Sequence, residues 1–175
     1  LRFAALDRPR AFVFDETYYA KDAFGLLTFG YEVNFVERAD KKILAGNLDV
    51  FTGDASYVVH PPLGKWVIAV GEQLLGVNPF GWRFLVAVVG TLMVLVVART
   101  VRRMTRSTLI GTIAGLLLAI DGMHLVMSRT ALLDLPLSFF VLVAFAALVL
   151  DRDTGRRRVS DRLNEFTQTG TGPRL

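Results

Sequence analysis

FLVAVVGTLMVLVVA, residues 84–98, is a run of fifteen uncharged residues, with Arg83 before it and Arg99 after it. Two more apolar runs follow at 109–127 and 135–150. Each is near or below the roughly 20 residues of a straight membrane span, but the arginine side chains beside them can reach back to the interface. Taken singly, each run would also suit a buried helix of a large soluble core. Three in succession, separated by arginine-rich breaks, predict three transmembrane helices.

The composition agrees with a membrane protein. Of the 175 residues, 53% are hydrophobic, and the mean hydropathy is +0.44. The absence of cysteine excludes a disulfide framework and a thiolate metal site. The chain does not begin with Met, and no apolar signal-peptide region follows residues 1–10. We therefore expect an N-terminal fragment of a longer protein.

The arginines give the predicted helices an orientation. They cluster after the first and third apolar runs, at Arg99, Arg102, Arg103, Arg106, Arg152, Arg156, Arg157, Arg158 and Arg162. The positive-inside rule puts both clusters in the cytoplasm, so residues 151–175 are expected there and residues 1–83 outside. The alternative of nucleic-acid binding is not favoured, because no aromatic interleaving or known module accompanies the arginines.

The first part of the predicted outer segment contains one helix and one loop. Residues 17–29 have mixed helical spacing and end at Gly30, which is typical of a helix C-terminus. Residues 33–54 are polar and contain turn signals at 46–47 and 52–54, so they are interpreted as a loop.

The second part is predicted to hold an interfacial helix. The proline pair 61–62 precedes residues 66–75, which are apolar on one side. Trp66 and Trp82 lie on either side of this segment, as expected for a helix near the lipid headgroups. A fourth membrane span is the alternative, and Glu72 makes it less favourable.

Ionisable residues collect on the predicted outer face. They are Asp15, Glu16, His60, Lys65, Arg83, Asp121, His124, Arg129 and Asp134. A carboxylate among them could take the proton of an attacking hydroxyl, and arginines suit bidentate contact with phosphate. Structural alternatives remain open: Asp15 could cap the following helix, His60 could be a turn residue, and Arg129 could pair with Asp134.

Six short motifs carry a resemblance to a known family. They are Phe14-Asp15-Glu16, Gly30-Tyr31-Glu32, His60-Pro-Pro-Leu-Gly-Lys65, Gly81-Trp82-Arg83, Leu118-Ala-Ile-Asp-Gly122 and Ser128-Arg-Thr-Ala-Leu-Leu-Asp134. In this order they resemble the protein O-mannosyltransferases, and the arginine-rich tail resembles the actinobacterial branch. The resemblance covers residues 10–153.

This resemblance implies an all-α membrane protein with polytopic transmembrane helices of GT-C type. Residues 1–83 would be an extracytoplasmic loop carrying interfacial helices, and residues 84–150 would hold three membrane helices. The family moves mannose, with inversion, from polyprenyl-phosphate mannose to Ser or Thr of exported proteins at the cell membrane. The implied partners are the lipid-linked donor, the acceptor protein, membrane lipids and the secretion translocon. The 175 residues alone are expected to be inactive.

The resemblance also implies roles for individual residues. Asp15 is expected to be the catalytic base, and Glu16 to orient the acceptor or carrier. The expected substrate-binding residues are Arg83, Arg129, Asp134, His60 and Lys65. No metal ligand is assigned, although some GT-C relatives use a divalent metal and carboxylates of this set could supply oxygens.

Two other functions stay open on the sequence. One is a GT-C enzyme that moves a different sugar onto lipid or cell-wall glycan. The other is a transporter or scaffold without enzyme activity, in which charged residues would line a route across the bilayer rather than collect at one face.

Overall fold

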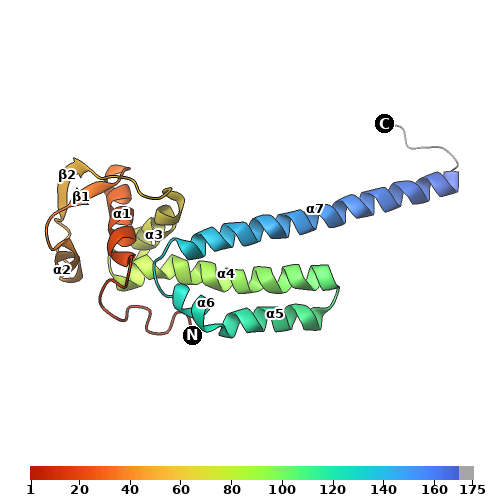
Figure 1. The fold of residues 1–175 in the computed structure, drawn as a ribbon, viewed down its shortest axis with the longest axis horizontal. Helices are drawn as coiled ribbons and strands as arrows, with labels where there is room; N and C mark the ends of the chain where they lie inside the picture. The colour runs from red at the N-terminus through yellow and green to blue at the C-terminus, as the bar shows by residue number, and fades with distance from the viewer. Residues whose placement is uncertain (170–175) are drawn as a thin grey trace.

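A computed structural model describes residues 1–169 of the chain, and Figure 1 shows its arrangement. Helices α1, α2 and α3 and the two strands gather at one end, and helices α4, α5 and α7 extend from them. The elements are α1 (Glu16–Phe29), β1 (Val33–Phe35), α2 (Ala39–Leu44), β2 (Phe51–Ala55), α3 (Leu63–Leu75), α4 (Pro79–Thr105), α5 (Thr108–Ile120), α6 (Gly122–Met127) and α7 (Asp134–Thr169).

Helix α4 is the central element of the long part. Its N-terminus is capped by the Asn78 side chain, which accepts hydrogen bonds from the backbone N–H groups of Phe80 and Gly81. Its 27 residues would span about 40 Å at 1.5 Å per residue. The apolar run 84–98 lies wholly within it. Arg106 ends the helix in a left-handed conformation (φ 56°), and α5 then returns along α4.

The apolar run 109–127 is not one continuous helix. Helix α5 ends at Ile120, and α6 begins at Gly122. Asp121 separates them because its carboxylate accepts a hydrogen bond from the backbone N–H of His124 (2.7 Å) and so caps α6. At 13 residues, α5 is apolar but shorter than a straight span.

Among the described residues, α4 and α7 are long and apolar enough to cross a membrane. Large apolar side chains on α4, α5 and α7 are exposed, including Leu95, Leu117, Leu137, Val141 and Leu148. A soluble monomer rarely exposes an apolar surface of this extent. Helix α7 continues well past residue 150 into a charged, exposed half that extends away from the other helices (Figure 1).

The segment 33–54, interpreted from its sequence as a loop, is ordered and contains strands, so an all-α fold is not correct for this part. Strands β1 and β2 pair antiparallel, and α2 connects them. The rings of Phe24, Phe29 and Phe35 surround Phe51, with centroid distances of 4.8, 4.9 and 5.3 Å. This aromatic contact stabilises strands that are too short for their alternation to be recognised in the sequence.

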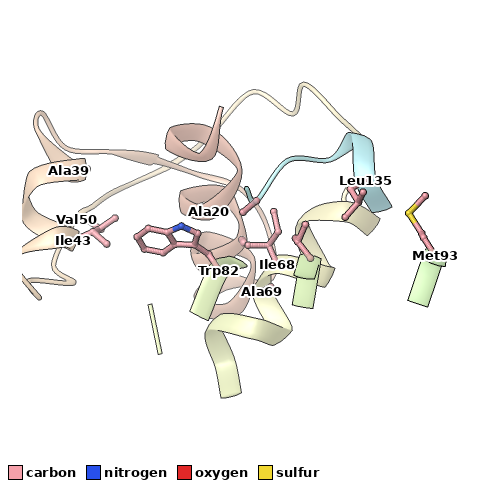
Figure 2. Close-up of a cluster of buried hydrophobic side chains, with 12 residues drawn as sticks. Ala20, Ala39, Ile43, Val50, Ile68, Ala69, Trp82, Met93 and Leu135 are labelled. Atoms are coloured by element: carbon pink, nitrogen blue, oxygen red, sulfur yellow. The ribbon is translucent and has the colours of Figure 1, made fainter. Parts of the chain in front are cut away.

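One buried core joins the short elements to the long helices. Figure 2 shows Ile68 and Ala69 of α3 close to Trp82 of α4, and the cluster also includes Ala20 of α1 and Leu135 of α7. The helix expected after the proline pair is therefore present as α3, with one face packed against α1 and α4. This packing fixes α1 and the start of α7 relative to α4.

Candidate active site

Glu16 and Arg83 form a buried ion pair at the start of α1. The Arg83 Nε and Nη2 groups donate to the two carboxylate oxygens of Glu16, both at 2.7 Å. The same oxygens accept the backbone N–H groups of Val13 and Ala131, both at 2.8 Å. Four donors fill the acceptor positions of this carboxylate. Glu16 therefore joins the segment before α1, helix α4 and the segment that leads into α7.

Arg83 has no donor left for a substrate phosphate. Its guanidinium has five N–H groups, and five hydrogen bonds leave it: two to Glu16 and three to backbone carbonyls of Leu6, Pro9 and Ala11. The side chain is 1% exposed. The geometry thus assigns Arg83 to holding the N-terminal segment, in place of the direct phosphate contact expected from the sequence.

Lys65 is buried in a second ionic cluster. Its ammonium donates to Glu32 (2.7 Å) and to Asp22 (2.9 Å). Burial by itself lowers the pKa of Lys65, but the hydrogen bonds and charges of Glu32 and Asp22 outweigh it, and the net pKa is raised. Lys65 thus connects α3 to α1 and to the start of β1, and its charge is already compensated.

Asp15 is placed differently from its neighbour Glu16. It occupies the N-cap position of α1, but its side chain makes no capping hydrogen bond. It remains half-buried, so it is accessible from the surface. The structural alternative of a simple helix cap is therefore not supported by its contacts, and the side chain of Asp15 is instead hydrogen-bonded to the Tyr19 phenol.

Asp15 lies in a group that brings together three segments of the chain. The pKa of the Tyr19 phenol is raised, first by burial and then by the negative charges of Asp15 and Asp134, while Lys65 opposes them. The Tyr19 ring meets the His60 ring edge-on, with 5.7 Å between centroids. We call Asp15, Tyr19, His60 and Asp134 the aspartate cluster. Asp134 and His60 are exposed, so this cluster opens to the surface.

Arg129 is hydrogen-bonded to the first residues of the chain. Its Nη1 donates to the carbonyls of Leu1 (2.6 Å) and Ala4 (2.7 Å), and Nη2 donates to Ala5 (3.2 Å). The Arg129–Asp134 salt bridge that the sequence left open is not formed in residues 1–169. Arg129 is half-exposed, and its hydrogen bonds go to neutral carbonyls. A phosphate could therefore replace these carbonyls, whereas it could not replace the buried Glu16 carboxylate that binds Arg83.

The described residues do not form a metal site. Within residues 1–169, no three His, Asp or Glu side chains are arranged to hold a metal ion. The carboxylate oxygens of Glu16, which the sequence offered as ligands, are filled by four N–H donors.

Comparison with known proteins gives the family. The profile described as dolichyl-phosphate-mannose-protein mannosyltransferase matches residues 1–160. The chain belongs to this family. It is 44% identical to the polyprenol-phosphate-mannose–protein mannosyltransferase of Mycobacterium tuberculosis over 93% of the chain and 28% of the relative. The protein of the same name from Corynebacterium glutamicum is 36% identical over 93% of the chain and 30% of the relative. No solved structure matches.

A second class of relative is more distant. The undecaprenyl phosphate-alpha-4-amino-4-deoxy-L-arabinose arabinosyl transferase of Pseudomonas paraeruginosa is 34% identical over 65% of the chain and 20% of that protein. The chain thus spans less than a third of the length of the curated relatives it matches.

Sequence reasoning missed several residues of this candidate site. Tyr19 was treated only as part of a helix, and Asp22 was not singled out. Glu32 belongs to the Gly30-Tyr31-Glu32 motif, so the sequence marks this residue but does not indicate its role. The carbonyls of residues 6, 9 and 11 that hold Arg83 leave no side-chain signal in the sequence.

Proposed function

We propose that the protein containing this chain transfers mannose from polyprenyl-phosphate mannose to Ser or Thr hydroxyls of exported proteins. Family membership supports this, and so do the names of the mycobacterial and corynebacterial relatives. The described chain would supply the first part of the site, and the rest of the parent would supply the remaining donor and acceptor contacts.

The proposed setting is the cell membrane, in a multi-pass GT-C enzyme with its active side extracytoplasmic. In support, the aspartate cluster lies near the start of α4, and Arg99, Arg102, Arg103 and Arg106 lie near its end. Helix α3 also exposes an apolar stripe at Leu63, Trp66, Val70 and Leu74, as an interfacial helix would. Acceptors would arrive from the secretion machinery, which makes the translocon a candidate partner.

The proposed reaction is a single inverting displacement. The Asp15 carboxylate accepts the proton of the acceptor hydroxyl as that oxygen bonds to the anomeric carbon of mannose. The bond between that carbon and the phosphate oxygen breaks, and its electron pair leaves with polyprenyl phosphate. One step of this kind needs a base and stabilisation of the leaving phosphate, and no covalent sugar–enzyme intermediate.

The observation that carries this assignment is the contrast between adjacent carboxylates. Glu16 is 0% exposed and accepts four hydrogen bonds, so it cannot accept a substrate proton without losing Arg83. Asp15, one residue earlier, faces the open aspartate cluster. We propose Glu16, Arg83 and Lys65 as positioning residues, and Asp134 and His60 as groups that contact the acceptor or the sugar. Arg129 is the proposed phosphate ligand.

The test uses the full-length parent in membranes supplied with polyprenyl-phosphate mannose and a Ser/Thr-rich exported peptide. Asp15→Asn keeps the shape and removes the charge, and loss of a general base slows transfer by about 10²–10⁴-fold. Asp54→Asn, on exposed β2, is the matched control and should transfer normally. Unchanged transfer by Asp15→Asn, at normal expression, would place the base elsewhere.

Transfer of another polyprenyl-phosphate sugar is the second candidate, and the 34% identity to the aminoarabinose transferase favours it over a transporter or scaffold. Donor profiling separates the two readings. Mannose transfer to peptide supports the first candidate, and transfer of a different sugar to lipid or glycan supports the second.

A further inference from the structure

A large groove lies at the end of the molecule away from the aspartate cluster. Helices α4 and α7 both begin near that cluster and diverge toward their C-terminal ends, as Figure 1 shows. Between them is a groove of about 1230 Å³. Pockets of a few hundred to a thousand Å³ hold small ligands, so this groove has room for a lipid headgroup and the adjoining part of its chains.

The mouth of the groove is strongly basic. Six arginines line it: Arg99, Arg102, Arg103, Arg106, Arg156 and Arg157. Asp153 is the carboxylate among its described lining residues, and it is bonded to Arg103 (2.9 Å) and to Arg152 (3.0 Å). Within residues 1–169, the other five lining arginines form no ion pair. The positive charges of these arginines repel one another, and a bound anion would relieve that repulsion.

The wall nearer the aspartate cluster is apolar. It is formed by Val96 of α4 and by Ala146, Val149 and Leu150 of α7, all of which precede the arginines along their helices. The groove therefore changes from apolar to basic along its length. Arg99 follows Arg83 by about 24 Å of helix at 1.5 Å per residue, so its guanidinium would lie near the far edge of a bilayer crossed by α4.

We infer that this groove binds the phosphate headgroup of an anionic membrane lipid, with the lipid chains along the apolar wall. Arginine binds phosphate through paired N–H groups, and basic pockets between membrane helices on the cytoplasmic side recognise anionic headgroups. The lipid would bind at the opposite end of α4 from the proposed transfer site. The inference rests on the membrane placement of α4 and α7 and is independent of the sugar transferred.

The test measures binding of dihexanoyl-phosphatidylglycerol to the purified full-length parent by microscale thermophoresis, at physiological salt. Dihexanoyl-phosphatidylcholine and inorganic phosphate are the two comparison ligands. The expected result is binding of phosphatidylglycerol that is about tenfold or more tighter than that of phosphatidylcholine, with no competition by inorganic phosphate. Equal binding of the two lipids would overturn the inference. Full competition by phosphate alone would show a free-anion site and overturn the lipid assignment.

Two pairs of substitutions locate the binding. Arg102→Gln with Arg156→Gln removes two lining charges, and Arg158→Gln with Arg162→Gln removes two charges on α7 that do not line the groove. The first pair should weaken phosphatidylglycerol binding by about tenfold or more, and the second should leave it nearly unchanged. An equal loss in both pairs would mean attraction to overall charge and would contradict a site in the groove.

One variant keeps every charge. Ala146→Trp should fill the apolar wall and weaken the binding of phosphatidylglycerol, and it serves as the second test if the arginine pair does not fold. Unchanged affinity of a folded Ala146→Trp protein for phosphatidylglycerol would overturn the placement of the lipid chains. Because binding is measured without transfer, failure of this inference leaves the mannosyltransferase proposal unaffected.

Discussion

Arg83 and Arg99 bracket the same apolar run of α4, yet their surroundings differ in every respect. Arg83 is 1% exposed and makes five hydrogen bonds, two of them to Glu16. Arg99 is exposed and lines a basic groove. A charge beside an apolar run can therefore mark the edge of a membrane or join distant parts of a fold. What decides between them is a carboxylate placed far away in the sequence, here 67 residues earlier.

The largest expected effect is a loss of stability on replacing Arg83, the buried arginine of this comparison. Arg83→Gln leaves the Glu16 carboxylate buried without its cation, which typically costs about 3–5 kcal/mol. Arg99→Gln changes an exposed side chain and should alter stability by about 0.5 kcal/mol or less. The measurement is the thermal unfolding midpoint of the full-length parent in detergent.

A double variant separates lost charge from lost packing. Glu16→Gln combined with Arg83→Gln removes both charges, so it should be more stable than Arg83→Gln alone. Equal midpoints for Arg83→Gln and Arg99→Gln would contradict the structural role assigned to the buried pair.

A second prediction compares two carboxylates that are buried near the start of α4. Glu16 accepts four hydrogen bonds, whereas Glu72 on α3 is 2% exposed and its oxygens have no hydrogen-bond partner within residues 1–169. Burial raises the pKa of Glu72 well above its ordinary value. Glu72→Gln should therefore stabilise the full-length parent at neutral pH, by about 1–3 kcal/mol.

The control for this prediction is the pH dependence of the stability difference between Glu72→Gln and wild type. A carboxyl whose folded pKa is raised contributes fully below its unfolded pKa, about 4.3, and its contribution is lost as pH rises toward the folded value. The advantage of Glu72→Gln over wild type should thus grow as pH increases from about 4.3. A constant difference in melting temperature across that range would show that Glu72 stays ionised or finds a partner.

The smallest expected effect on stability concerns the exposed, C-terminal end of α4. Arg103 and Asp153 form a partly exposed ion pair at 2.9 Å between α4 and α7. Ion pairs near the surface contribute little to stability because water screens them, so Arg103→Gln should lower the melting temperature only slightly, and less at high salt. If Arg103→Gln lowered the melting temperature as much as Arg83→Gln does, the proposed contrast between the two ends of α4 would be wrong.

The sequence is sufficient to predict a helix or its ends where neighbouring residues determine the backbone conformation. Gly30 ends α1 with a positive φ of 81°, and Asp15 stands at its start. The proline pair 61–62 precedes α3, and the run 84–98 lies inside α4. In each case a turn residue, a proline pair or a long apolar run determines the backbone within a few residues.

Features that depend on distant partners were not predictable in the same way. The burial of Lys65 requires Glu32, and that of Arg83 requires Glu16, across 33 and 67 residues. The motif Gly81-Trp82-Arg83 marks Arg83 in the sequence but does not reveal its partner. The strands β1 and β2 were missed because they contain three and five residues, and the break at Asp121 was hidden within an apolar run.

The hydrogen bond from Ala131 N–H to Glu16 has a mechanical consequence. It ties the segment leading into α7 to the same carboxylate that holds Arg83 of α4, and Asp15 is the residue next to that carboxylate. A movement at the start of α7 would therefore act on the position of the proposed base. An incoming acceptor would find room more easily beside His60, which lies on the segment 56–62, outside any helix or strand.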